Sequence, residues 1–327
     1  MNSILLAASS SSAGIAIFKP LYWLFGVCMG FLMDVLNNQY FLAIVIFTIV
    51  TRLILLPINI HQQKTTAKTT RLQPKIQKLQ KKYPDPKDRM KLNEEMQELY
   101  AREGHNPMQM GCGPMLFQMV FLMGIIGIIY YPLSYVLGMK EIADKSSELM
   151  EVIQQLGYKG TYLQLGILEN FAEYKDTLVA KFPTMFTPEN CVQIEAYRDG
   201  MTIAGLDMTA IPHWKDGIIV IVPILCLVTS LLSTLVSTLI QNKNNPAAAQ
   251  QMSQMLIMML MMPFFSFYIA FKVPAAVGFY WIISNIIAIL QQLYIAKCFP
   301  PKRSQARLML ENTIYRRSRE ANIKKIK

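Results

Sequence analysis

The sequence has few of the residues from which catalytic and metal sites are built. Its 327 residues include five cysteines and three histidines, with no C-x-x-C motif and no metal-ligand spacing among them. Isolated cysteines of this kind are typical of small apolar positions, and scattered histidines of polar loops. We therefore expect no zinc site, no cysteine nucleophile and no Ser-His-Asp triad.

Charged residues are also scarce. They make up 16% of the chain, whereas 53% of the residues are hydrophobic, and soluble domains carry about 25% charged residues. The apolar residues gather in segments of about 20, the length that spans a ~30 Å hydrocarbon layer. The sequence therefore predicts an all-α polytopic membrane protein. The predicted spans are residues 39–60, 114–137, 217–240, 255–271 and 275–296.

The segments between these spans differ in character. Residues 1–38 include an aromatic stretch, 15–37, that Lys19, Pro20 and Asp34 interrupt, which favours an interfacial amphipathic helix over a sixth span. Residues 61–107 have two runs of helical apolar spacing on either side of the sequence YPDP, which predicts a helical hairpin in water. Residues 138–214 form a polar insertion, for which a folded cap, a partner-docking element and a neutral insertion all stay open.

Charge predicts the orientation in the membrane. Residues 61–107 hold 11 basic and 6 acidic residues, the tail 297–327 holds 10 and 2, and the insertion holds 6 and 11. Basic segments stay on the cytoplasmic side. The hairpin and the C-terminal tail are therefore expected in the cytoplasm, and the insertion and the N-terminus outside.

One arginine, Arg52, lies inside the first apolar segment. A charge in lipid costs about 2.5–3.5 kcal/mol on insertion scales. At ~1.5 Å per residue Arg52 lies about 12 Å from Ile60, farther than its side chain comfortably reaches. None of the five predicted spans contains an acidic partner. Water inside the membrane would solvate the Arg52 charge at the lowest cost in free energy. A structural charge that is hydrogen-bonded to backbone carbonyls stays an alternative.

On the first span Arg52 shares a helix face with Thr48, Thr51, Asn59 and Gln62, and the third and fifth spans carry similar polar stripes. Three helices with one polar face each can surround a hydrophilic groove, although Ser and Thr at helical spacing are also ordinary packing residues in membranes. The fifth-span stripe also includes Gln291 and Gln292. The predicted groove lining is Thr48, Thr51, Arg52, Asn59, Gln62, Gln118, Ser230, Ser233, Ser237, Trp281, Ser284 and Asn285.

Several stretches together resemble the YidC/Oxa1/Alb3 family of membrane protein insertases. They are TIVTRLILLPINIHQQK on the first span, the hairpin and second span from LQPKIQKLQKKYPDP to GIIGIIYYPLS, and MMPFFSFYIAFKVPAAVGFYWIISNIIAILQQLYI on the last two. The resemblance implies a five-helix core around a hydrophilic groove, in which Arg52 is the groove arginine. It also implies action without a cofactor on nascent membrane proteins, alone or beside the Sec translocon, in the bacterial plasma membrane. Insertion breaks no covalent bond, so we do not expect an enzyme.

The resemblance implies further partners, and the sequence departs from the family pattern at two places. The cytoplasmic hairpin would receive the substrate, the basic tail would contact the ribosome and anionic lipids, and a monomer would suffice. Ser233 stands where many members have a glutamine, and the 138–214 insertion is far longer than the outer loop of single-membrane bacterial members. The predicted ribosome and lipid contacts are Arg316, Arg317, Arg319, Lys324 and Lys325.

Two other classes of protein stay open. An anion channel or transporter could use Arg52 as its binding site, and an inverted repeat or helices broken by Gly or Pro near the midplane would favour it. The sequence shows no convincing repeat. A structural membrane scaffold is the third class.

Overall fold

The computed structural model describes residues 16–102, 113–215, 217–244 and 252–300, with short parts of the tail at 306, 309–310, 313–314 and 317–318. The chain divides into two compact units. Unit 1 takes the residues up to Thr51, Gln118–Ser230 and Pro263–Asn285, and unit 2 takes Arg52–Phe117, Leu231–Met262 and the residues from Ile286 onward. The described residues are mostly helical, which confirms the predicted fold class at that level.

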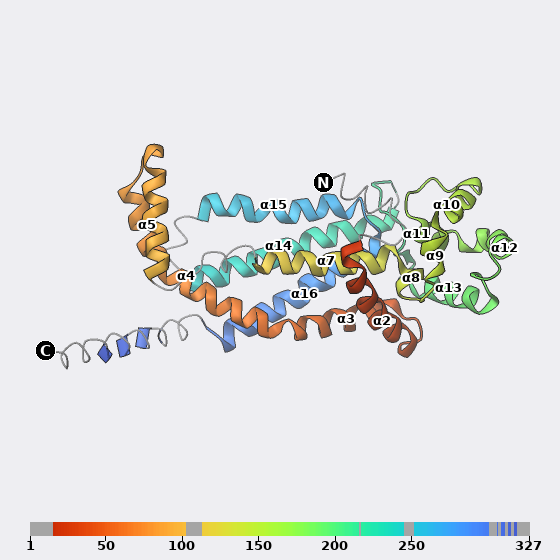
Figure 1. Ribbon diagram of the computed structural model, residues 1–327, viewed down its shortest axis with the longest axis horizontal. Coiled ribbons are helices and arrows are strands. Elements are labelled where there is room, and N and C mark those ends of the chain that lie inside the picture. Colours follow the sequence, from red (N-terminus) through yellow and green to blue (C-terminus); the bar gives the residue numbers. More distant parts are fainter. Residues whose placement is uncertain are drawn as a thin grey trace. The chain divides into compact units, whose positions relative to one another are not determined.

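Five apolar helices follow the predicted spans (Figure 1). They are α3 (Tyr40–Ile54), α7 (Gly113–Tyr130), α14 (Ile221–Asn244), α15 (Met252–Ala270) and α16 (Ala275–Cys298). Within the described residues, Gly217–Ile240 (η3, Gly217–Val220, with α14) and Ala275–Cys298 are long and apolar enough to cross a membrane. The apolar stretches Tyr40–Ile54, Val120–Tyr130 and Leu260–Ala270 are shorter. Five membrane crossings therefore stay a prediction.

Prolines divide two of the apolar segments. Helix α3 ends at Ile54, and α4 (Leu56–Lys82) begins with Pro57 in its first turn. Helix α7 ends at Tyr130, and the short α8 (Pro132–Tyr135) begins at Pro132. A proline has no backbone N–H for a continuing helix and its ring clashes with the preceding turn. Neither 39–60 nor 114–137 is therefore one straight helix.

In unit 1, helix α2 (Lys19–Val35) follows η1 (Ala16–Phe18) and packs against α8. At Gly26 the two backbones come so close that a Cβ atom would overlap the carbonyl oxygen of Tyr135, so this packing requires a glycine. The side of α2 that faces away from the core carries exposed Trp23, Phe31 and Val35. With apolar residues on both sides, α2 suits a lipid environment, and its interfacial position stays a prediction.

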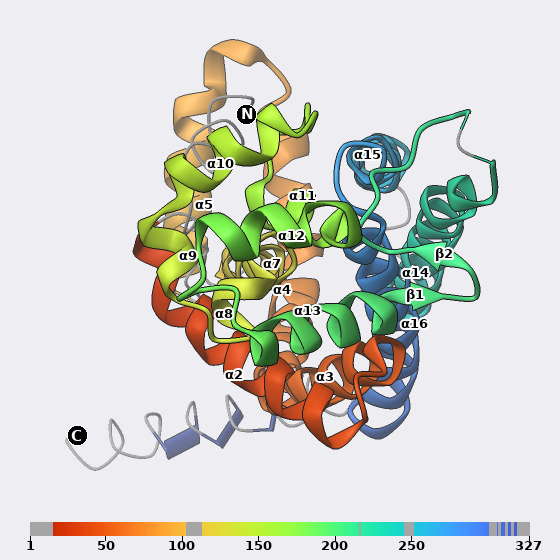
Figure 2. The ribbon, with the colours of Figure 1, turned by 90° about the vertical axis from the view of Figure 1, so that its right-hand side faces the viewer.

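The 138–214 insertion folds as part of unit 1 (Figure 2). Its helices are α9 (Glu141–Asp144), α10 (Ser146–Gln155), α11 (Leu163–Glu169), α12 (Phe171–Lys181) and α13 (Pro188–Gly200), followed by the hairpin of β1 (Thr202–Ile203) and β2 (Leu206–Asp207). Thr187 caps α13 by accepting a hydrogen bond from the backbone of Asn190 at 3.3 Å. Buried residues from each of the five helices join one apolar core with α2, α3 and α7.

Hydrogen bonds attach the insertion to helices α8 and α16 of unit 1. The buried amide of Gln164 donates to the Ser134 hydroxyl at 2.6 Å and accepts from the Ser134 backbone at 3.1 Å. At the start of α16, the backbone N–H of Ala275 donates to Ala210 and that of Ala276 to Met208, at 2.9 and 2.8 Å. The insertion is therefore a folded body fixed to α8 and α16.

In unit 2, α4 packs against α5 (Arg89–Arg102), which follows the turn η2 (Pro86–Asp88). Leu72, Ile76 and Leu99 are buried between the two helices. Lys82 donates to the Glu95 carboxylate at 2.7 Å, and the Tyr83 hydroxyl donates to the same oxygen. These hydrogen bonds lower the pKa of Glu95. The contacts hold the two helices side by side, as the apolar spacing predicts.

Candidate functional site

The threonines of α3 satisfy their hydroxyl groups within the helix. Thr48 is buried, and its hydroxyl donates to the carbonyl of Ile44 at 2.6 Å. Thr51 is half-buried and donates to the carbonyls of Phe47 and Thr48 at 2.8 and 2.9 Å. Such back-bonding lets a hydroxyl lie in an apolar environment without a further partner. Thr48 therefore lies inside unit 1, and Thr51 lies closer to its surface.

Arg52 lies in the last turn of α3 and is half-buried. Its neighbours Leu53 and Ile54 are 61% and 67% exposed, so this turn also has an apolar outer side. The last carbonyls of a helix have no donor within the helix, and the side-chain amide of Gln291 donates to the carbonyl of Arg52 at 3.3 Å. A contact within unit 2 thus fixes the helix end that carries the arginine.

Polar side chains of α14 form hydrogen bonds with polar side chains of α16 in both units. In unit 1 the Asn285 amide donates to the Ser230 hydroxyl at 2.8 Å and to the Thr229 hydroxyl at 3.3 Å. In unit 2 the Ser237 hydroxyl donates to the Gln292 side chain at 2.7 Å. Other sides of the two helices expose Leu232, Leu235, Leu239, Leu290 and Leu293. Both helices therefore have one polar side and one apolar side.

The remaining predicted residues lie in different environments. Ser284 is buried, and Asn59, Ser233 and Trp281 are half-buried. The side chains of Gln62 and Gln118 lie outside the described residues, as do Arg316, Arg319, Lys324 and Lys325, whereas Arg317 is exposed. The predicted lining left out Thr229, Gln291 and Gln292, which supply polar contacts. The helical spacing does place Gln291 and Gln292 on the fifth-span stripe and Thr229 at the margin of the third-span stripe, although none of the three was included in the lining.

Comparison with known proteins assigns the family. A family model described as 60Kd inner membrane protein matches residues 31–303, which takes in all five apolar helices. The chain belongs to this YidC/Oxa1 family. The relative named Membrane protein insertase YidC 2 of Listeria innocua is 26% identical over 291 residues, covering 88% of this chain and 74% of the relative. The family resemblance predicted from the motifs is thereby confirmed.

Other YidC/Oxa1 relatives support the same assignment. Membrane protein insertase YidC 1 of Listeria monocytogenes is 27% identical over 277 residues, or 84% of this chain and 70% of the relative. Membrane protein insertase YidC of Oceanobacillus iheyensis is 41% identical over 102 residues, or 31% of this chain and 38% of the relative.

A functional site can also consist of metal ligands. Among the residues of this chain that the structure describes, no three His, Cys, Asp or Glu residues lie together as a group that could hold a metal ion.

Proposed function

We propose that this membrane protein insertase holds the hydrophilic tails of nascent membrane proteins along a groove formed by the polar sides of α3, α14 and α16. Relatives over most of the chain carry the name membrane protein insertase, which supports insertion as the activity. The observation that carries the proposed route is the position of Arg52. It is half-buried at the end of α3, beside the exposed Leu53 and Ile54, and Gln291 donates a hydrogen bond to its backbone carbonyl.

The proposed mechanism lowers a desolvation barrier. A client protein must move a polar tail through hydrocarbon before its apolar segment can settle in lipid, and unpaired polar groups are costly in an apolar medium. Polar side chains and water along part of the membrane would shorten the dry distance and raise the local dielectric constant. Arg52 would attract acidic residues of the tail. The apolar segment would then leave sideways and be stabilised in lipid.

Reconstitution separates this function from its alternatives. The purified chain is placed in liposomes, and a single-span client with a short acidic tail is synthesised in their presence. We expect the chain to increase the protease-protected fraction of the client several-fold over empty vesicles, because the tail crosses with a lower barrier. Equal protection in empty vesicles would contradict the insertase function. Chloride flux through the same liposomes, without insertion, would instead favour an anion channel.

We also propose that the N-terminus and the insertion face outward and that the α4–α5 hairpin and the tail face the cytoplasm, because the hairpin and the tail are basic and the insertion acidic.

Cysteine labelling tests this topology. Cys28 and Cys112 are replaced by serine, and cells are labelled with a membrane-impermeant maleimide. Cys298 is exposed, and we expect its labelling only after the cells are opened. A cysteine in place of the exposed Glu173 on α12 should be labelled in intact cells. The reverse pattern would contradict this topology.

The basic cytoplasmic segments are the proposed contacts for the ribosome and anionic lipids. Lys75, Lys78 and Lys81 on α4 and Arg317 in the tail are exposed. Phosphate groups of RNA or lipid attract such side chains, with an affinity that falls as salt rises. We propose that a monomer acts alone or beside the Sec translocon, and that the hairpin first receives the client.

A further inference from the structure

An exposed aromatic cluster lies in unit 1, where the 138–214 insertion meets the apolar helices. It consists of Trp214, Phe267 and Phe271. The indole ring of Trp214 stacks on the ring of Phe271, with ring centroids 4.4 Å apart. Phe267, one turn earlier on α15, lies edge-on to both rings, at 6.1 Å from Trp214 and 5.2 Å from Phe271. Trp214 is 69% exposed, so these contacts leave most of its side chain outside the protein core.

The aromatic cluster lies where two apolar helices begin. Within the described residues, Gly217–Ile240 and Ala275–Cys298 are long and apolar enough to cross a membrane. Trp214 comes just before the first of these helices, and Phe271 comes just before the second. Because the two rings are stacked, the two helices begin close together. Farther along both helices Asn285 donates to Ser230, so α14 and α16 run in the same direction from the aromatic cluster.

A lysine follows each of the two stacked rings. Lys215 comes directly after Trp214 and Lys272 directly after Phe271, and both lysines are exposed. Among the described residues, neither lysine is in an ion pair, and none accepts a hydrogen bond from the indole N–H of Trp214. The sequence adds one acidic neighbour, Asp216, which lies outside the described residues. The surface therefore combines apolar rings, a hydrogen-bond donor and an excess of positive charge.

This combination suits the boundary between the hydrocarbon and the headgroups of a lipid bilayer. Tryptophan is enriched at that boundary because its ring is apolar whereas its N–H needs a polar partner. Lysine side chains near a membrane surface are attracted to anionic lipids. Ile218 in η3 is 75% exposed, so apolar surface continues from the aromatic cluster into the helix that follows.

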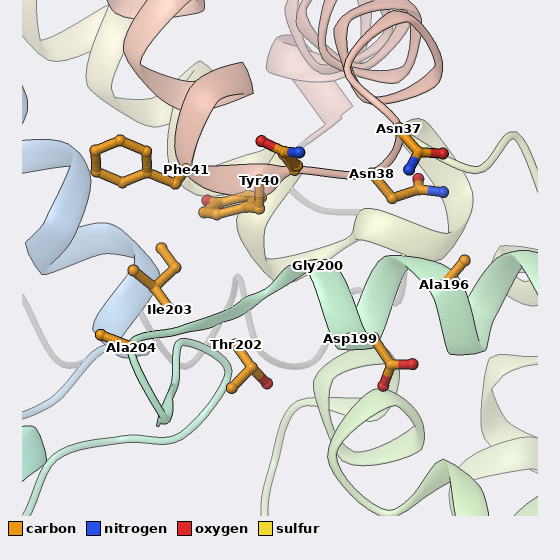
Figure 3. Close-up of a pocket in the computed structure, with 11 residues that line it drawn as sticks. Asn37, Asn38, Tyr40, Phe41, Ala196, Asp199, Gly200, Thr202, Ile203 and Ala204 are labelled. Carbon is orange, nitrogen blue, oxygen red and sulfur yellow. The ribbon is translucent and has the colours of Figure 1, made fainter.

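A polar pocket of unit 1 has a different chemistry (Figure 3). Its volume is about 510 Å³, and it lies between the turn of Asn37 and Asn38 and the end of α13. Asp199 is one of the described residues that line it, and no lysine or arginine is among them. A carboxylate repels a phosphate group. The aromatic cluster with its two lysines is therefore the better site for a lipid phosphate.

We propose that the aromatic cluster, together with Lys215 and Lys272, binds an anionic phospholipid. The lysines contact its phosphate, and the rings lie against its glycerol and the upper part of its acyl chains. The bound lipid holds the starts of α14 and α16 at the headgroup level and so sets the depth of Ser230 and Asn285 below it. This site goes beyond the proposed insertase function and needs only that the chain is a membrane protein. The proposed topology assigns the lipid to the outer leaflet.

Fluorescence of Trp214 tests its position in the bilayer. The sequence has three tryptophans, and Trp23→Phe with Trp281→Phe leaves Trp214 as the emitter in the full chain. In nanodiscs, lipids brominated near the glycerol should quench this emission about threefold more strongly than lipids brominated near the end of the acyl chain. The control adds Trp214→Phe and Glu173→Trp, which moves the tryptophan to an exposed position on α12. There, either lipid should quench less than about a tenth of the emission.

A second measurement tests the lysines. The protein with Trp214 as its emitter is placed in phosphatidylcholine that contains a small fraction of brominated phosphatidylglycerol or of a brominated glycolipid without phosphate. We expect phosphatidylglycerol to associate about fivefold more strongly, because the lysines attract its phosphate. Lys215→Gln with Lys272→Gln should reduce this preference to less than about twofold. Lys215→Arg with Lys272→Arg keeps the charge and should keep the preference.

Three results would overturn the proposal. Quenching of Trp214 no stronger than in the Glu173→Trp control would place the aromatic cluster outside the bilayer. Weak quenching of Trp214 by both lipids and by aqueous iodide would show that another protein or a second copy covers it. Equal association of phosphatidylglycerol and the glycolipid with the natural lysines would exclude the phosphate contact, and this comparison does not depend on the folding of the glutamine variant.

The outcome is separate from that of the insertion experiment. If the expected quenching and lipid preference are found but liposomes with the natural chain do not insert the client, the insertase function fails and the lipid site stands. If the client is inserted but phosphatidylglycerol has no preference, the lipid site fails and the insertase function stands.

Discussion

Replacing Arg52 by alanine is expected to reduce insertion of a client with an acidic tail about tenfold or more, because a charge-assisted hydrogen bond contributes about 1.5–3 kcal/mol. Insertion of a client with a neutral tail should fall less than about twofold, because that tail makes no such bond. The measurement is the initial rate of client protection in liposomes that contain equal amounts of each variant. The tail sequences should differ only in the replacement of Asp and Glu by Asn and Gln.

Arg52→Lys is the control for charge. It keeps the positive charge at the half-buried end of α3, so most of the preference for acidic tails should remain. The backbone carbonyl that Gln291 contacts is present in all three proteins, and the alanine variant should therefore keep this helix end in place. An equal loss of insertion for acidic and neutral tails would contradict a role in tail binding and indicate a structural arginine.

The polar stripes show how far helical spacing alone can predict the candidate site. The spacing placed Ser230, Ser237 and Asn285 on polar faces, and in the structure all three form hydrogen bonds between α14 and α16. It could not predict that Asn285 pairs with Ser230, because the relative register of two helices depends on their packing. For the same reason it could not predict that Gln291 bonds to the carbonyl of Arg52.

The helix ends and the insertion were harder to predict. Hydropathy averaged over a span hides a single residue such as Pro57 or Pro132, although each lacks the backbone donor that the continuing helix needs. The insertion has short helices, and its core takes a few residues from each, such as Ile153, Ile167 and Ile194. No segment there is long enough for a clear 3.6-residue period, so its fold follows from contacts between segments distant in the sequence.

The insertion provides the largest expected effect on stability. Phe186 is fully buried beside Phe171 in the core that the insertion shares with α2, α3 and α7. Phe186→Ala leaves a cavity and should destabilise unit 1 by about 3–5 kcal/mol, because the lost burial and the void both cost free energy. Measured by amide hydrogen exchange of the full chain in nanodiscs, protection of α11, α12 and α13 should fall at least a hundredfold.

Val192→Ala is the matched control, since Val192 lies on α13 but is 64% exposed, and its truncation should change protection little. The α4–α5 hairpin has its own core of Leu72, Ile76 and Leu99 in unit 2, so its protection should be unchanged in both variants. Because the core of the insertion is continuous with Ala43 and Phe47 of α3, we expect the Phe186 variant to lose protection in α3 as well. Loss confined to α11–α13 would show that the insertion unfolds independently, and equal loss in the hairpin would show that the whole chain unfolds as one cooperative unit.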